Sequence, residues 1–212
     1  MADRRDRGKP LVSVRVYVEG GGDARSTKDA CREAFRELFK KIVPSGSAPK
    51  VIASGRRLKA FLNFCDALRD YPDQKIMLLV DSESPVTTGV WDHLRSRPED
   101  GWDKPPNASE DQAHLMVQCM EAWFLADKDL LREHYGQHFG TSALPAQPNV
   151  ELITKTDMEA RLKQATRRTT KGPYQKSSHA FALLALVDPA KVRAASAHAA
   201  LFFDTLARYC EE

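Results

Sequence analysis

The sequence lacks the features that mark membrane, secreted and zinc-binding proteins. Only four cysteines occur in 212 residues, and none form a C-x-x-C pair, which argues against a zinc site and a disulfide framework. No apolar run approaches the ~20 residues needed to cross a bilayer. The N-terminus, MADRRDRGKP, has basic residues without a hydrophobic region, so we predict neither a signal peptide nor an anchor. These absences predict a cytoplasmic protein with ordinary buried thiols.

The formal charge is also small, but it is unevenly distributed. A net charge of +3 does not by itself indicate a nucleic-acid-binding protein. Residues 155–176 contain seven Lys or Arg and two acidic residues, whereas residues 81–111 contain eight acidic and three basic residues. Two interpretations stay open. The segments form facing acidic and basic walls of one site, or they are two solvated surfaces.

The first half of the chain alternates between strand and helix patterns. Valines alternating with other residues over 12–18 predict a strand, which Gly20 to Gly22 end abruptly. A helical period over 30–43, capped by Ser26 or Thr27, comes next. The pattern continues with a strand at 51–53, a helix over 58–68 and a strand at 76–80. The last strand is fully apolar, so this order predicts a β-α-β-α-β unit with a parallel sheet.

The second half is predicted to be mainly helical after one more strand. Ser84-Pro85 suits either a helix start or a loop, and the acidic, proline-containing residues 95–111 predict an irregular covering loop. A strand at 114–117 then leads into two helical patterns, CMEAWFLAD and DLLREHY. Small residues and proline over 140–148 indicate the main boundary.

Three helices are predicted beyond that boundary. Thr156 and Glu159 match a capping box for a helix over 158–165, and a second, apolar helix covers 180–187. Asp188-Pro189 begins the last helix. Its predicted buried face consists of Val192, Ala195, Phe202, Phe203, Leu206 and Tyr209.

Three carboxylates follow two of the predicted strands. Glu19 ends the first strand, and Asp81 and Glu83 come directly after the apolar strand. Because the carboxyl ends of parallel strands meet at one edge, where ligands bind in open α/β sheets, we expect these side chains to converge. Three like charges repel unless a cation joins them, and oxygen ligands suit Mg²⁺ or Mn²⁺. The alternative is that Glu19 and Asp81 are turn or cap residues.

This pattern resembles the Toprim fold of primases, topoisomerases and old-family nucleases. Its motif is a glutamate after the first strand and Asp-x-Asp after the third, and here Glu83 replaces the second aspartate. The resemblance covers residues 11 to about 125. It implies that Asp81 and Glu83 hold Mg²⁺, and that Glu19 is a metal ligand or a general acid or base.

A closer resemblance spans nearly the whole chain. The phrases VYVEGGGD, LLVDSES and QCMEAWFLAD, with K-x-x-Y-x-K-x-x-H at residues 171–179, are similar to an uncharacterised bacterial Toprim-like family. Members of that family often accompany ATPases of the ABC or AAA type in mobile and defence loci. The resemblance implies an ATPase partner and a role in antiviral defence.

Four further residues are candidates for the same site. Glu121 lies in an otherwise apolar helical pattern and needs a partner, which is either the metal site or a buried salt bridge or hydrogen bond. Lys171, Lys176 and His179 lie near a predicted helix start, where lysines and backbone amides suit a phosphate. The alternative is that the lysines are solvated and that a serine caps the helix.

These observations predict an α/β, Toprim-like, mostly parallel sheet flanked by helices. We expect a Toprim-like domain over residues 1–140 and a helical C-terminal extension over 141–212, packed on the same domain against its active edge. The predicted function is Mg²⁺-dependent phosphodiester hydrolysis of DNA or RNA. The alternative is a noncatalytic regulatory subunit of an ATPase complex that binds a nucleotide or nucleic acid.

Overall fold

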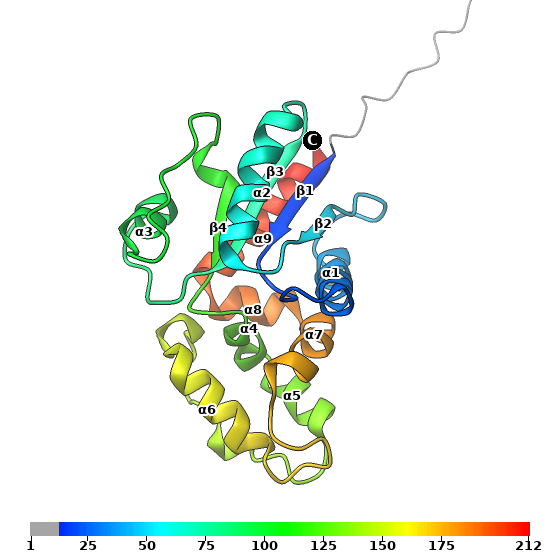
Figure 1. The fold of residues 1–212 in the computed structure, drawn as a ribbon. Helices are drawn as coiled ribbons and strands as arrows, with labels where there is room; N and C mark the ends of the chain where they lie inside the picture. Colours follow the sequence, from blue (N-terminus) through cyan, green and yellow to red (C-terminus); the bar gives the residue numbers. More distant parts are fainter. Residues whose placement is uncertain (1–12) are drawn as a thin grey trace, which may run out of the picture.

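A four-stranded parallel sheet forms the centre of the protein (Figure 1). The computed structural model describes residues 13–212, so the predicted strand residue Val12 and the N-terminal segment lie outside the described residues. The strand order is β2-β1-β3-β4. These strands are β1 (Val14–Val18), β2 (Lys50–Ala53), β3 (Lys75–Asp81) and β4 (Ala113–Met116). The predicted α/β fold with a parallel sheet is therefore confirmed.

The strand pairing places β1 and β3 in the middle of the sheet. Val16 of β1 pairs with Val51 on one side and Met77 on the other, and Asp81 of β3 pairs with Met116 of β4. All of β3 after its first residue is buried, which explains its continuous apolar sequence. Both central strands end at the same edge, so the residues that follow them are close in space.

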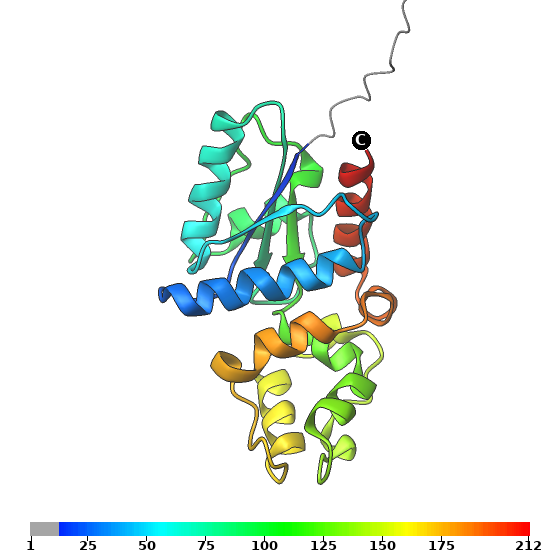
Figure 2. The same ribbon diagram turned by 90° about the vertical axis from the view of Figure 1, so that its right-hand side faces the viewer.

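Helices cover both faces of the sheet. On one face α2 (Arg57–Asp70) and α3 (Val90–Ser96) pack on the even-numbered side chains of β3, such as Leu78. On the other face α1 (Arg25–Lys40) and α9 (Ala197–Glu211) pack on the odd-numbered ones, such as Leu79. Figure 2 shows α2 and α9 on opposite sides of the strands. The alternation follows from the two-residue period of a strand.

A group of four helices lies beyond the carboxyl edge of the sheet, at the bottom of Figure 1, and we call it the helical lobe. Its members are α4 (Glu121–Ala126), α5 (Lys128–Tyr135), α6 (Lys155–Thr166) and α7 (Lys176–Leu186). After it, α8 (Pro189–Ala195) leads to α9, which returns to the sheet and packs on β4. The short 3₁₀ turns are Glu110–Gln112, Thr141–Ala143 and Val150–Leu152. The predicted helical C-terminal region is confirmed.

One hydrophobic cluster contains side chains from both sides of the predicted boundary at residue 140. The Phe39 ring of α1 lies 5.7 Å from the Phe202 ring of α9, and both rings are fully buried. The same cluster includes Trp123 of α4 and Leu183 of α7. The division at residue 140 itself stays a prediction.

None of the helices over the described residues 13–212 has both the length and the apolar character of a membrane span.

Several predicted helix starts were wrong. Helix α1 begins at Arg25 after an N-cap without a side-chain bond, so neither Ser26 nor Thr27 is the cap. The cap of α6 is Thr154, which accepts a hydrogen bond from the Asp157 amide, instead of the predicted Thr156. The α1 cap is Ala24, two residues before the nearer predicted one, and the α6 cap also lies two residues early, because threonine recurs there. Helix α7 begins at Lys176, four residues before the predicted start.

One connection differs from the sequence prediction, and a second adopts one of its two predicted alternatives. The last predicted helix is broken at Ser196, whose extended backbone separates α8 from α9. Ser196 bonds to the Glu151 carboxylate, a contact between residues far apart in the chain. Ser84-Pro85 lies in a loop, and the next helix starts at Val90. The irregular segment predicted from residue 95 begins after Ser96.

Candidate metal centre

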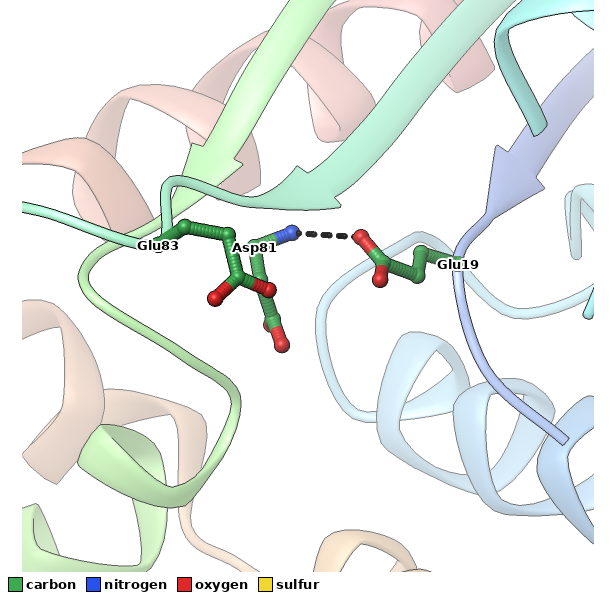
Figure 3. Close-up of side chains that lie close together, drawn as sticks. All are labelled: Glu19, Asp81 and Glu83. Atoms are coloured by element: carbon green, nitrogen blue, oxygen red, sulfur yellow. Dashed lines mark hydrogen bonds between the residues drawn. The ribbon is translucent and has the colours of Figure 1, made fainter. Parts of the chain in front are cut away.

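The three predicted carboxylates converge at the carboxyl edge of the sheet. Glu19 follows β1, Asp81 is the last residue of β3, and Glu83 lies two residues beyond it. One ligand oxygen from each lies within 4.8 Å of the others. Figure 3 shows Glu19 approaching from the β1 side and the other two from the β3 side. The Asp81 amide donates a hydrogen bond of 3.2 Å to Oε2 of Glu19.

The backbone around Glu19 is held by the neighbouring strands. The Glu19 amide donates to the Leu79 carbonyl at 3.0 Å, and Gly20 exchanges backbone hydrogen bonds of 2.9 and 3.0 Å with Gly55. Gly21 has a φ of 82°, and a β-carbon there would lie 2.8 Å from the Lys28 backbone. This close approach requires glycine. The turn is therefore a tightly packed wall of the site.

Glu83 adopts a backbone conformation that is unusual for a glutamate. Its φ is 65°, in the left-handed region, and its amide donates a 2.8 Å hydrogen bond to the Gln118 carbonyl. Non-glycine residues in this region are uncommon and concentrate at functional sites. The bond to the segment after β4 holds the Glu83 side chain beside Asp81.

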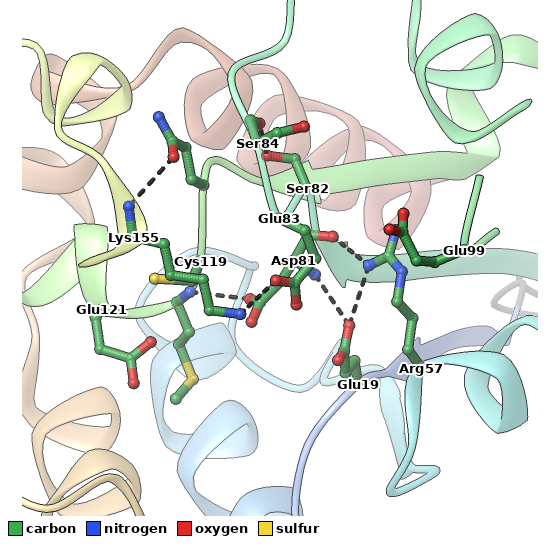
Figure 4. Close-up of polar contacts among 12 residues, drawn as sticks. Glu19, Arg57, Asp81, Ser82, Glu83, Ser84, Glu99, Cys119, Glu121 and Lys155 are labelled. Atoms are coloured by element: carbon green, nitrogen blue, oxygen red, sulfur yellow. Dashed lines mark hydrogen bonds and ion pairs between the residues drawn. The ribbon is translucent and has the colours of Figure 1, made fainter. Parts of the chain in front are cut away.

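An arginine that sequence reasoning missed binds two of these positions. The Arg57 guanidinium, at the start of α2, donates to Oε2 of Glu19 at 3.2 Å and to the Asp81 carbonyl (Figure 4). Its other nitrogens bind both oxygens of Asp100 at 2.8 and 2.7 Å. The Asp100 side chain is 2% exposed and also accepts a hydrogen bond from Arg97 at 2.8 Å. Arg57 is therefore held in one orientation by Asp100.

A second set of contacts reaches Asp81 from the helical lobe. The Met120 amide donates to Oδ1 of Asp81 at 2.9 Å, and Nζ of Lys176 lies 3.7 Å from Oδ2. The same Nζ lies 3.3 Å from the buried Glu121, which also accepts a 3.0 Å hydrogen bond from Tyr174. Glu121 thus has a salt bridge and a hydrogen bond and lies outside the group of three carboxylates. Figure 4 shows Glu121 and Arg57 on opposite sides of Asp81.

Burial perturbs the acidity of the site. Burial raises the pKa of Asp81 to about 7, because desolvation and the Glu19 and Glu121 carboxylates together exceed the opposing effect of Lys176. Burial also raises the pKa of Glu19, although Arg57 opposes this shift. Burial acts to lower the pKa of Lys176, but Asp81 and Glu121 raise it above its ordinary value. The site therefore combines carboxylates that bind protons readily with a lysine that stays charged.

Lys155, which the sequence analysis counted only within the basic segment, forms an ion pair with Glu83. Two of the predicted basic residues, in contrast, lie away from the carboxylates. His179 Nδ1 lies 3.0 Å from the Tyr135 hydroxyl. Lys171 is exposed. Among the contacts of the described residues, none joins Lys171 or His179 to the three carboxylates.

Two cavities flank the carboxylates, and Glu19 lines both. The first has a volume of about 380 Å³ and lies between the glycine turn, Asp81 and the start of α7. The second, of about 340 Å³, is lined by Glu83, Arg57, Trp102 and other residues of α2 and the loop after α3. The carboxylates therefore stand between two openings instead of at the bottom of one.

One protein-family model matches most of this chain. The model of a family described as a domain of unknown function, DUF4276, matches residues 18–207. The chain belongs to the DUF4276 family. No curated protein and no solved structure matched the chain in these comparisons.

The DUF4276 match covers the whole candidate centre. It begins one residue before Glu19 and includes Arg57, the Asp81 and Glu83 pair, and Lys176. For Arg57 the sequence carries a weak signal, because the dipeptide Arg56-Arg57 follows a strand and a glycine, as residues at a sheet edge do. Lys155 is separated from Glu83 by 72 residues, and no local pattern pairs them.

Proposed function

We propose that this protein is a Mg²⁺- or Mn²⁺-dependent nuclease that hydrolyses a phosphodiester bond of DNA or RNA. The observation that carries the proposal is the convergence of Glu19, Asp81 and Glu83, with ligand oxygens within 4.8 Å of one another. They lie at the carboxyl edge of a parallel sheet, where ligands bind in open α/β folds. The motif resemblance to Toprim nucleases supports the same reaction.

The donor set fits a hard divalent cation. The three side chains offer only carboxylate oxygens, which suit Mg²⁺ and Mn²⁺, and they come from two rigid strand ends. Asp81 is 4% exposed, so a cation there offsets the repulsion between buried charges. When bound, such a cation polarises the phosphate and lowers the pKa of water.

The basic side chains orient the substrate and the carboxylates. Lys176 is half-exposed and charged beside Asp81, so its Nζ has access both to the carboxylates and to a phosphate in the adjacent cavity. Lys155 forms an ion pair with Glu83, so its Nζ likewise has access to both a carboxylate and a phosphate bound beside it. Arg57 holds Glu19 and the end of β3 together. Glu19, whose pKa burial raises, is the candidate to accept or donate a proton.

The biological setting is proposed from the resemblance alone. Family members that accompany ABC- or AAA-type ATPases in defence loci suggest a cytoplasmic antiviral nuclease that works with a partner ATPase. Co-purification of the chain with an ABC- or AAA-type ATPase from its native host tests this part of the proposal.

Cleavage assays with purified protein test the nuclease proposal. We expect degradation of labelled DNA or RNA with Mg²⁺ or Mn²⁺, alone or with the partner ATPase, and no degradation with EDTA. Asp81→Asn and Glu19→Gln should each reduce cleavage by about 10²-fold or more, because each removes an anionic ligand. Glu133→Gln, a change at an exposed acid of α5, is the matched control and should keep full activity.

Metal binding gives a second measurement that does not depend on activity. Mg²⁺ or Mn²⁺ should raise the melting temperature of the wild-type chain and of Glu133→Gln, since a ligand that binds only the folded state stabilises it. Asp81→Asn should show a much smaller rise. Full cleavage by Asp81→Asn and Glu19→Gln, with equal metal effects in all variants, would contradict the proposal.

One observation favours a second candidate function, a noncatalytic subunit that binds nucleotide or nucleic acid for an ATPase partner. Each carboxylate already faces a basic side chain, because Glu19 pairs with Arg57, Asp81 with Lys176 and Glu83 with Lys155. Because these basic side chains balance the carboxylate charges, a metal ion is less important for offsetting their mutual repulsion. Nucleic-acid binding that is equal with and without divalent metal, and without any cleavage, distinguishes this candidate.

A further inference from the structure

The 380 Å³ cavity beside the carboxylates has two different walls. One wall is backbone, made by Gly20, Gly21, Gly22 and Gly55. The other is the first turns of α7, where Ser177 and Phe181 are four residues apart and therefore share a helix face. Met116 and Met120, both buried, also line it, and Lys176 lies where the cavity meets Asp81.

The size and chemistry of this cavity fit a single nucleotide. Its volume lies within the range of roughly 300 to 1,000 Å³ typical of small-molecule sites. Phe181 is half-buried, and a β-carbon at Gly20 would lie 3.8 Å from its ring and 3.0 Å from the Cys31 sulfur, so the glycine leaves the ring close to the backbone of the turn. An aromatic ring with two methionines offers an apolar surface for a base, as in single-strand-binding proteins. Lys176 supplies the charge for a phosphate.

From these observations we infer that the cavity receives one unpaired nucleotide of a single-stranded nucleic acid, with its base against Phe181. The inference rests on the proposed function, since it places the phosphate of that nucleotide at the carboxylates. Glu19 and Asp81 line the cavity directly, so the sugar-linked phosphate of a nucleotide whose base is inside it would lie beside them.

The consequence is a preference for substrate structure. A base inside a duplex is stacked and paired, and it enters a protein pocket only after extrusion, which costs a few kcal/mol. Single strands, overhangs and chain ends present bases without that cost. The protein should therefore bind and cleave unpaired segments, whereas the interior of a blunt duplex is a poor substrate.

Binding in EDTA tests the inference without cleavage. Fluorescence anisotropy is measured with labelled single-stranded DNA, single-stranded RNA and the corresponding blunt duplexes, using the full chain. We expect tighter binding of single strands than of duplexes. Phe181→Ala should weaken single-strand binding by about tenfold, as loss of one base stack does, and Phe181→Trp should retain it. The DNA and RNA arms identify which polymer is bound.

One further variant is a matched control, and another is a second test of the cavity. Leu186→Ala changes an exposed residue of the same helix that does not line the cavity, and it should leave binding unchanged. Ser177→Glu places an acid in the first turn of α7, where it is compatible with the helix dipole, and it should weaken binding by repelling the phosphate. Circular dichroism verifies the fold of each variant.

The two proposals fail in different ways. Single-strand binding that depends on Phe181, without cleavage under any metal condition, overturns the nuclease proposal and keeps the cavity as a nucleotide site. Cleavage that requires Asp81 but proceeds equally on single strands and blunt duplexes overturns the nucleotide inference. Equal single-strand binding by the wild type, Phe181→Ala and Ser177→Glu overturns it as well.

Discussion

A single guanidinium connects three parts of the candidate centre. Arg57 binds Glu19 after β1, the Asp81 carbonyl at the end of β3, and Asp100 in the loop after α3. It is 14% exposed, and the Asp100 side chain is 2% exposed, so this pairing excludes most solvent. Removing one member of such a pair leaves a buried charge without its partner. Arg57 therefore contributes to folding and to the position of Glu19.

Replacing Arg57 should destabilise the protein. We expect Arg57→Ala to lower the free energy of unfolding by about 3 kcal/mol, because Asp100 keeps only Arg97 as a partner. Urea denaturation measures the change. The neighbouring Arg56 is 80% exposed and pairs with an exposed aspartate, so Arg56→Ala should change stability by less than about 0.5 kcal/mol. Equal effects of the two substitutions would contradict this account of Arg57.

The raised pKa of Asp81 makes stability depend on pH. The folded state holds this proton up to about pH 7, whereas an aspartate in an unfolded chain loses it near pH 4. The stability that Asp81 contributes is therefore present below about pH 4 and is lost as the pH rises to about 7. Asp81→Asn has no such proton to lose.

The comparison of wild type with Asp81→Asn cancels the groups that are distant from Asp81, because these titrate alike in both proteins, and leaves the titration of Asp81 together with its coupling to Glu19. Without added metal, the variant should gain stability relative to the wild type between pH 4 and pH 7. The gain should reach a few kcal/mol, since each pKa unit corresponds to about 1.4 kcal/mol. Urea denaturation across this range measures it. A difference that is constant with pH, or that grows as the pH falls, would contradict the prediction.

At the scale of elements, the break between α8 and α9 shows how a distant contact interrupts a continuous helical pattern. Ser196 caps α9 by accepting a 3.0 Å hydrogen bond from the Ala199 amide and donates a 2.6 Å bond to Glu151. Glu151 also accepts from the His198 amide at 2.8 Å. These bonds satisfy the first amides of α9 and turn the helix back toward β4.

Substitution at this cap should cost measurable stability. Ser196 is 2% exposed, so Ser196→Ala removes both its cap bond and one of the hydrogen bonds to the Glu151 carboxylate. We expect the free energy of unfolding to fall by about 1–2 kcal/mol. Ser178→Ala, at an exposed position of α7, should have almost no effect. Thermal denaturation measures the melting temperatures of the two variants. Equal melting temperatures would show that the Ser196 cap does not contribute to stability.

At the scale of the whole molecule, the C-terminal helices complete the site that the sheet begins. Helix α7 packs along α1, which follows the glycine turn, so Lys176 and Phe181 reach the end of β1. Helix α6 brings Lys155 to Glu83. Because the same hydrophobic cluster joins α1, α7 and α9, loosening the C-terminal packing also changes the walls of the centre. The site is therefore a property of the complete fold.

The sequence by itself determined the parallel α/β sheet and the meeting of Glu19, Asp81 and Glu83. Both depend on local information. Side-chain periodicity identifies strands and helices, and parallel strands bring their carboxyl ends to one edge. Helix starts were less predictable, as at Thr154, because several nearby residues have side chains able to cap.

The tertiary structure alone decided which side chains surround those carboxylates. Arg57 and Lys155 reach them across long stretches of chain, while Lys171 and His179, predicted from the same motif as Lys176, lie elsewhere. The cavity between the glycine turn and Phe181 exists only because α7 packs on α1. Such contacts depend on how buried helix faces fit together, and a local sequence pattern carries no record of that fit.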